Sequence, residues 1–599
     1  MYAVMMTIAA VAVIATSSAA FDGRKWNVST GNISVNFIQA SPIGHLAKPG
    51  YVMEAPPSVE SLIEMKKQGL VANEDYVAWG AVEREPGKWD WTQHDKVYEN
   101  IKAAGLDYVV YNWTHFPPVW LREGSSTDRT LMRCVEHHEN TNYLSIYDPK
   151  TIEHYDHFYK GLWEHFGDRI DGVYACILGP YGEGNYPLNV PDFINMGHIH
   201  EGYWCQDPYG LTAFRNAMRA KYKDIAALNS AWKTDLINFS SVLPPKEIGE
   251  GLKPSLQVFS TAGDRRRWLD FITWYHQALI DFTEESIKVT LKYFPKEKVR
   301  TKPGGNAGGV NPIAWGTYCP GYAKMAGPYG IVLQPADCQG ACFGDKWVGT
   351  AYKFYGVTLS TEPAGGLDKN GFTRRMFSDA SCGAKQLFTY EYTAHVPEIQ
   401  KYIHLYTGEM GDTDVAVLCP TTLYRLGGDL GPTISESAKL RDLTDYDVLD
   451  ELLITDGALD RGRYSKLVIL QGDFIDQPIL DRIEKWVRRG GTLVIASGKP
   501  VCNVEGDVWS HSASAGTVKL GKGSVACLRA KKENAPAYDE LYSQARSLLG
   551  ADGTFDGVWT TKRGSETLIL NQTDKLVMCK VAGKTSEVEV APHSIVSVR

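Results

Sequence analysis

Residues 74–114 decide the fold: they read EDYVAWG at 74–80, HDKVYENIKAAGL at 94–106 and DYVVYNWT at 107–114. The first and last segments are apolar and rich in β-branched and aromatic residues, which is typical of buried strands. The middle segment has apolar residues at helical spacing and ends near Gly105. A strand, a helix and a second buried strand in this order predict a parallel sheet that is covered on both faces.

The same alternation continues on both sides of this unit. We expect a first strand within residues 37–57, and further helices and strands at 59–70, 152–167, 171–180, 268–293, 331–334 and 385–390. Eight such units over about 400 residues fit one known architecture with insertions. The sequence therefore predicts an α/β fold, a (β/α)8 TIM barrel, at residues 21–410.

The pattern changes after Gly408. Strands at 413–420, 464–472 and 492–498, with a helix at 478–491, predict a smaller α/β domain over residues 411–510. Short alternating segments such as GSVACLR and ETLILNQT follow, with one helix near Tyr538–Leu549. They predict a small β-rich, sandwich-like domain at 511–599.

Composition excludes some classes of function. The net charge is −8 and the pI is about 6.0, so nothing resembles the basic footprint of a nucleic-acid-binding protein. The 16 Trp and 32 Tyr suit either a large core or a surface on which sugar rings stack. The 11 Cys are scattered and no pair has CxxC spacing, so buried thiols are expected.

The chain begins MYAVMMTIAAVAVIATSSAA, an apolar segment that ends in small residues. It lacks the basic start of a standard signal peptide, yet we interpret residues 1–20 as an export signal rather than a buried helix. The expected location is therefore secreted or periplasmic. We expect no membrane span, because no later stretch is long and apolar enough.

Two glutamates follow predicted strands in settings that suit catalysis. Glu183 lies in GPYGEGNYP (179–187), where glycines allow a sharp turn at a strand exit. Glu362 lies in VTLSTEPAGG (357–366), where Pro363 stops the strand. In such barrels the active site lies at the carboxyl ends of the strands. The alternative is an ordinary loop or capping carboxylate, and for Glu362 alone the two interpretations are even.

Glycosidic cleavage needs two facing carboxyl groups. One protonates the leaving oxygen, and the other attacks the anomeric carbon or activates water. Glu183 and Glu362 fit these roles. Glu391, in FTYEYTAH (388–395), is a third candidate, which could bind a hydroxyl or hold a neighbouring residue in place. Tyr390 beside it is also expected to bind the substrate.

Three segments together resemble the family-42 glycoside hydrolases, the bacterial β-galactosidases of clan A. AWGAVEREPGKWDW (78–91) is similar to the second barrel unit of that family, and YNWTHFPPVWL (111–121) to its third strand. Residues 203–234, YWCQDPYGLTAFRNAMRAKYKDIAALNSAWKT, resemble the segment after its acid/base. The resemblance covers roughly residues 55–500, because the domain after Thr413 looks like the trimerisation domain of the family.

The resemblance implies roles for named residues. Glu183 would be the acid/base and Glu362 the nucleophile of a retaining double displacement, because they follow the fourth and seventh strands. The sugar would be lined by Trp79, Asn112, Trp113 and Trp315. The resemblance also implies a homotrimer, an oligo- or polysaccharide substrate, and exo action on a β-linked sugar.

Two departures from family 42 matter. The family has Asn directly before the acid/base, but this chain has Gly182, and its segment 179–187 resembles the inverting family-14 β-amylases. The zinc cluster often found in family 42 retains only Cys205 here, so we expect no metal or other cofactor there. The side chains of Cys134, Glu136, His137 and His138 could bind metal, but a substrate or surface loop is favoured.

Two alternatives stay open. One is an inverting, β-amylase-like hydrolase of α-glucan, and the other is a carbohydrate-binding barrel without catalysis. The sugar could be a β-galactoside, β-mannoside, β-glucoside or a decorated sugar. The separation of the two carboxyl groups discriminates between retention and inversion.

Overall fold

The structure of the chain is a computed structural model. It describes residues 28–31, 57–125, 127–176, 178–179, 183–187, 197–245, 254–304, 313–337, 342–363, 366–390, 392–530, 535–551, 556–581 and 587–599. The proposed export segment, Gly182 and Glu391 lie outside these residues. Within them, no helix is both long and apolar enough to cross a membrane.

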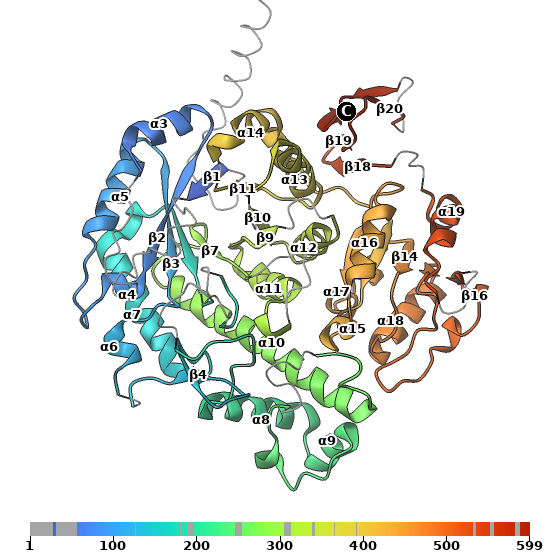
Figure 1. Cartoon of the computed structure of the whole chain (residues 1–599), viewed down its shortest axis with the longest axis horizontal. Helices are drawn as coiled ribbons and strands as arrows, with labels where there is room; N and C mark the ends of the chain where they lie inside the picture. The colour runs from blue at the N-terminus through green and yellow to red at the C-terminus, as the bar shows by residue number, and fades with distance from the viewer. Residues whose placement is uncertain are drawn as a thin grey trace, which may run out of the picture.

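Eight parallel strands close into a barrel (Figure 1). In order they are β1 (Val28–Gly31), β2 (Ala72–Ala78), β3 (Asp107–Trp113), β6 (Gly172–Ala175), β7 (Val299–Thr301), β8 (Val332–Leu333), β10 (Thr358–Pro363) and β11 (Gln386–Phe388). The barrel closes because β11 pairs with both β10 and β1. A two-residue strand, β9 (Ala336–Asp337), extends the sheet beside the end of β10. The predicted (β/α)8 fold is confirmed.

Helices connect the strands and cover the outside of the barrel. They include α3 (Val59–Lys67), α5 (Thr92–Ala103), α7 (Pro149–Phe166), α10 (Ala262–Thr290), α11 (Cys319–Ala326), α12 (Cys342–Tyr355) and α13 (Lys369–Ser381). Several begin where the sequence offers an N-cap: the side chains of Ser58, Asp148, Thr261 and Asp368 accept backbone N–H groups of the first turn. These caps fix where each helix starts above its strand.

The first barrel strand differs from the expectation. It was expected within residues 37–57, but β1 is Val28–Gly31, and residues 32–56 lie outside the described part of the chain. The VSTG sequence of β1 is short and polar at two of its four positions. A strand of this kind gives no clear apolar run in the sequence. It is recognised as a strand only by its pairing with β2 and β11.

The second domain is a six-stranded, mainly parallel sheet. Its order is β13 (Asp447–Asp450), β12 (Val415–Cys419), β14 (Lys466–Ile469), β15 (Thr492–Ile495), β17 (Gly523–Cys527) and β16 (Gly516–Leu520). Only the edge strand β16 runs antiparallel to its neighbour. The segment GSVAC was expected in the C-terminal β-rich domain, but as β17 it pairs in parallel with β15. The α/β sheet therefore extends beyond residue 510.

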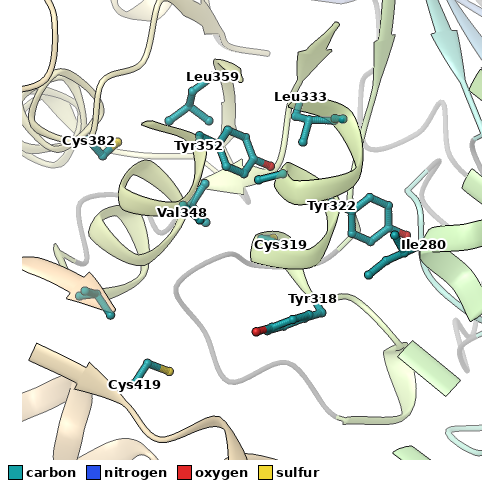
Figure 2. Packing of buried hydrophobic residues seen from close by; sticks show 14 of the residues in the cluster. Ile280, Tyr318, Cys319, Tyr322, Leu333, Val348, Tyr352, Leu359, Cys382 and Cys419 are labelled. Carbon is teal, nitrogen blue, oxygen red and sulfur yellow. The ribbon is translucent and has the colours of Figure 1, made fainter. Parts of the chain in front are cut away.

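The barrel and the second domain share one hydrophobic core. Figure 2 shows part of it, with side chains of α11 and α12, such as Tyr322 and Val348, and Cys419 of β12 as members of the same cluster. The hydroxyl of Tyr318 donates a hydrogen bond to Asp450 at the end of β13. The second domain is thus packed firmly against one side of the barrel.

The C-terminal residues form two small antiparallel sheets. One contains β18 (Val558–Arg563), β19 (Glu566–Asn571) and β22 (Ser594–Val598), and the other contains β20 (Val577–Cys579) and β21 (Val588–Val590). Arg563 joins this domain to the barrel. Its buried guanidinium donates to the carbonyls of Leu405, Ala380, Ala384 and Tyr406, at 2.7–3.0 Å. Burial lowers the pKa of Arg563 to about 10.

Arg563→Met should destabilise the protein by about 3–5 kcal/mol, because it leaves four buried carbonyls without their shared donor. The measurement is the urea dependence of unfolding, followed by circular dichroism. The exposed neighbour Lys562 supplies the control, since Lys562→Met should change stability by no more than about 0.5 kcal/mol. Equal stability of the two variants would contradict the role of Arg563 as a clamp.

Candidate active site

The predicted catalytic residues meet at the carboxyl end of the barrel. Glu183 follows β6, the fourth barrel strand, and Glu362 lies near the end of β10, the seventh. Lys302 directly follows β7, and Tyr390 follows β11. Side chains from the ends of four barrel strands therefore lie in one region. This is expected, because the carboxyl ends of all parallel strands meet at the same end of a closed barrel.

The backbone around Glu183 is held by close contacts. Gly179 donates its N–H to the carbonyl of Glu183 at 2.6 Å, and Gly184 donates to the carbonyl of Lys302 at 2.8 Å. A Cβ atom on Gly184 would lie 2.7 Å from that carbonyl oxygen, so only glycine permits the approach. These bonds tie the segment after β6 to the segment after β7 and fix the position of Glu183 beside Lys302.

Lys302 lies between the two glutamates. Its Nζ is 3.5 Å from an oxygen of Glu183 and contacts an oxygen of Glu362 more closely. Because both carboxylates reach one nitrogen, their nearest oxygens are within about 6 Å of each other. The side chain of Glu183 is 16% exposed, against 6% for Glu362 and 3% for Lys302. Glu183 is therefore the more accessible carboxylate of a largely buried trio.

Two donors meet the carboxylate of Glu362. Burial lowers the pKa of Lys302, but the carboxylates of Glu362 and Glu183 outweigh burial and raise it above its ordinary value. Lys302 is thus a stable cation. The hydroxyl of Tyr390 donates a second hydrogen bond to Glu362, and burial keeps this hydroxyl protonated by raising its pKa. Two donors on one carboxylate stabilise its negative form.

A third carboxyl group, Glu74 on β2, lies near the trio. Its oxygens accept hydrogen bonds from Tyr174, at 2.7 Å, and from Tyr76, at 3.4 Å. Burial raises the pKa of Glu74 from 4.5 to about 7, although the bond from Tyr174 and the charge of Arg300 oppose the rise. Arg300 and Lys302 share one face of the chain, because side chains alternate along an extended segment.

Sequence reasoning did not single out Lys302, Glu74 or Arg300. One signal was present: Arg300 and Lys302 stand two residues apart at a strand end, in VRTKPGG (299–305). Alternating cations that face a barrel interior need acidic partners. The partners come from β2 and β10, which are distant in sequence.

Replacing Glu74 should change the pH dependence of stability. The folded state holds the Glu74 proton up to about pH 7, whereas the unfolded state releases it near pH 4.5. This contribution to stability is complete below pH 4.5 and is lost as the pH rises to 7, a loss of about 3 kcal/mol. The free energy of unfolding of Glu74→Gln, minus that of the wild type, should therefore be larger at pH 8 than at pH 4. Urea unfolding at both values measures the gain, and the exposed Glu64→Gln should show none.

The other predicted site residues lie at different depths. Trp79 and Trp113 are fully buried, and Nε1 of Trp79 donates to Glu83 at 2.7 Å. Asn112 is also buried and donates to the carbonyl of Tyr174 at 3.0 Å. Trp315 is partly exposed, and its carbonyl accepts the N–H of Tyr186. Of the predicted set within the described residues, the structure brings Glu183, Glu362 and Tyr390 together, and Glu391 lies outside those residues.

Comparison with known proteins finds that the chain is similar to sugar-cleaving enzymes. Residues 37–316 match the model of glycosyl hydrolase family 14. This range contains Glu183 and Lys302 but ends before Glu362. The chain is 28% identical over 239 residues to a thermophilic β-amylase of Thermoanaerobacterium thermosulfurigenes, covering 37% of this chain and 41% of that one. It is 24% identical over 203 residues to a β-galactosidase, BbgII, of Bifidobacterium bifidum, covering 31% and 26%.

Solved structures agree on the fold. A family-42 β-galactosidase from G. stearothermophilus superposes with a TM-score of 0.66 at 14% identity, covering 96% of this chain and 98% of the other. The chain thus spans less than half the length of the two curated relatives above but nearly all of a solved family-42 structure. The double resemblance to families 42 and 14 that the sequence indicated is confirmed.

Proposed function

We propose that this protein is a glycoside hydrolase that cleaves β-linked sugars by a retaining double displacement, with Glu183 as acid/base and Glu362 as nucleophile. One observation carries the proposal: glutamates from the fourth and seventh strand ends contact the same buried ammonium, Lys302. Their nearest oxygens lie within about 6 Å of each other. Retaining enzymes place the two carboxyl groups about 5–5.5 Å apart and inverting enzymes about 6.5–9.5 Å apart.

The asymmetry of the contacts supports the assignment of roles. A nucleophile must be ionised, and Glu362 has the closer contact with Lys302 and the bond from Tyr390. A general acid must hold a proton that it can deliver to an incoming oxygen. Glu183 has the longer contact with Lys302 and the more exposed side chain, which suits proton delivery to a bound substrate.

The reaction then has two steps. Glu362 attacks the anomeric carbon while Glu183 protonates the departing glycosidic oxygen, which gives a glycosyl ester on Glu362 and a free alcohol. A water molecule next attacks the anomeric carbon as Glu183 removes its proton, and the ester bond to Glu362 breaks. Each enzyme group returns to its starting protonation state, and the sugar keeps its configuration.

A second candidate is an inverting hydrolase of α-glucan. It is favoured by the family-14 match over residues 37–316 and by the segment GPYGEGNYP. In that mechanism Glu183 is again the acid, while Glu362 activates a water molecule instead of attacking carbon. The two candidates therefore differ in their substrate and in the role of Glu362. Glu183 is the general acid in both.

The experiment is a screen of aryl β-glycosides, aryl α-glycosides and soluble starch, followed by ¹H NMR of the first-formed sugar. Hydrolysis of a β-glycoside with the β-anomer appearing first supports the retaining proposal. Hydrolysis of starch with the β-anomer appearing first supports the second candidate instead. If the folded protein hydrolyses none of these substrates, both candidates are contradicted, and a carbohydrate-binding barrel without catalysis is favoured.

Export and assembly belong to the same proposal. Residues 1–20 would direct the chain to the periplasm or the medium, and the 411–510 domain would form a trimer as its resemblance implies. Cell fractionation and light scattering of the purified protein test the two statements separately.

A further inference from the structure

Four side chains that can bind a metal ion lie close together, and neither Glu183 nor Glu362 is among them. They are Cys134 and His137, at the tip of the hairpin formed by β4 (Leu131–Arg133) and β5 (Asn140–Leu144), and His198 and His200. One potential ligand atom from each lies within 4.8 Å of the other three. The sequence favoured a substrate or surface loop for Cys134 and His137. Their partners stand about sixty residues further along the chain.

The three imidazoles are arranged around a common point. Each pair of ring centroids is 4.9 Å apart, and the planes are inclined at 85°, 74° and 64°. Nδ1 of His137 lies 3.0 Å from Nε2 of His198. Tetrahedral zinc with bonds of about 2.0–2.1 Å to nitrogen places neighbouring nitrogens about 3.3 Å apart. The two nitrogens therefore have the separation of two ligands on one ion.

Two backbone amides face the sulfur of Cys134. Its sulfur accepts the backbone N–H groups of His137, at 3.2 Å, and Glu139, at 3.5 Å. The left-handed backbone of His138, with φ of 59°, turns the hairpin tip so that these amides face the sulfur. Backbone donors stabilise a negatively charged sulfur, which is the form that binds metal.

Backbone hydrogen bonds fix the hairpin that carries Cys134 and His137 against the segment that carries His198 and His200. Val135 donates to the carbonyl of Tyr203 at 2.8 Å, and His198 donates to that of Asn140 at 3.2 Å. The carboxylate of Glu136 is also within reach, 3.9 Å from Nε2 of His200. A thiolate and a carboxylate together offset the double charge of a divalent ion.

We propose that Cys134, His137, His198 and His200 bind a structural Zn²⁺ ion. One thiolate and three imidazoles form a closed tetrahedral set, which suits zinc and leaves no position for a substrate. This donor set differs from four cysteines, and Cys205 is buried apart from it. The ion would join the β4–β5 hairpin to the chain that follows Glu183. Trp204 already reaches back to that chain by donating to the carbonyl of Pro187 at 2.9 Å.

The test uses the full-length protein stripped of metal by a chelator and then titrated with Zn²⁺ or Co²⁺ alone. We expect about one equivalent of either ion to bind. The cobalt form should give the strong visible bands of tetrahedral Co²⁺ and a sulfur-to-metal charge-transfer band. Zinc should also raise the midpoint of thermal unfolding, since it binds only the folded site.

Two variants and one control sharpen the result. Cys134→Ser should remove the charge-transfer band, and His198→Ala should weaken zinc binding by at least about tenfold. His138→Asn should bind zinc like the wild type, because His138 stands beside the cluster but outside it and Asn tolerates its left-handed backbone. If a variant does not fold, the cobalt spectrum of the wild type decides. Wild-type protein that binds no cobalt, or binds it with an octahedral spectrum, overturns the proposal, and glycosidase activity plays no part in the readout.

Discussion

Glu362→Ala should reduce kcat/KM by at least about 10³-fold on every substrate that the wild type hydrolyses. The side chain that attacks the anomeric carbon is then missing, and no other group can form the glycosyl ester. Activated aryl glycosides should not rescue the variant, because a better leaving group cannot replace a nucleophile. Steady-state kinetics on one activated and one unactivated glycoside measure the effect.

The loss must be separated from misfolding. Glu362→Ala removes the closer ion pair of Lys302 and keeps the longer one to Glu183, so some loss of stability is expected. Circular dichroism and thermal unfolding show whether the variant is folded at the assay temperature. Glu398→Gln is a matched control: Glu398 is a buried glutamate of α14 (Val396–Tyr402) that contacts Lys369, outside the trio. A folded Glu362→Ala protein with activity near that of Glu398→Gln would contradict the nucleophile assignment.

Glu183→Ala should show a different pattern, which depends on the leaving group. On an unactivated disaccharide the loss should be about 10²–10⁴-fold, the usual contribution of a general acid. On a dinitrophenyl glycoside the first step should be nearly normal, because that leaving group departs without a proton. A burst of dinitrophenol followed by slow turnover is expected, since the second step still lacks its base.

Stopped-flow absorbance of dinitrophenol release measures the burst and the slow phase. The control is Glu85→Ala, an exposed glutamate of the same barrel, which should behave like the wild type on both substrates. Normal hydrolysis of an unactivated disaccharide by Glu183→Ala would show that another group supplies the proton.

The barrel could be predicted because its strands are buried on both faces and its helices are amphipathic. β2 and β3, for example, are buried seven-residue strands, and each was found within two residues of its bounds. Glu183 and Glu362 could be found because they follow such strands among glycine and proline. β1 was missed and β17 was assigned to the wrong domain. The sheet to which a short strand belongs depends on the strands with which it pairs, and these are distant in sequence.

The surroundings of the glutamates could not be predicted in the same way. Lys302 follows a strand of only three residues, and its role depends on Glu183 and Glu362, which are distant in the chain. Trp79 and Trp113 illustrate the opposite difficulty, because a tryptophan at a strand end suits a core as well as a sugar site. Their full burial is a property of tertiary packing. His198 and His200 likewise meet Cys134 only through the fold.

The most direct test of the central claim is to trap the covalent intermediate on Glu362. A 2-deoxy-2-fluoro glycoside with a dinitrophenyl leaving group forms the ester but hydrolyses slowly, because fluorine destabilises the oxocarbenium-like transition states. The sugar series is chosen from the aryl glycoside that the wild type cleaves fastest. Peptide mass spectrometry after digestion should find one fluoroglycosyl group on the peptide that contains Glu362. Unlabelled protein that still hydrolyses the parent glycoside, or a label on another carboxylate, would contradict the account.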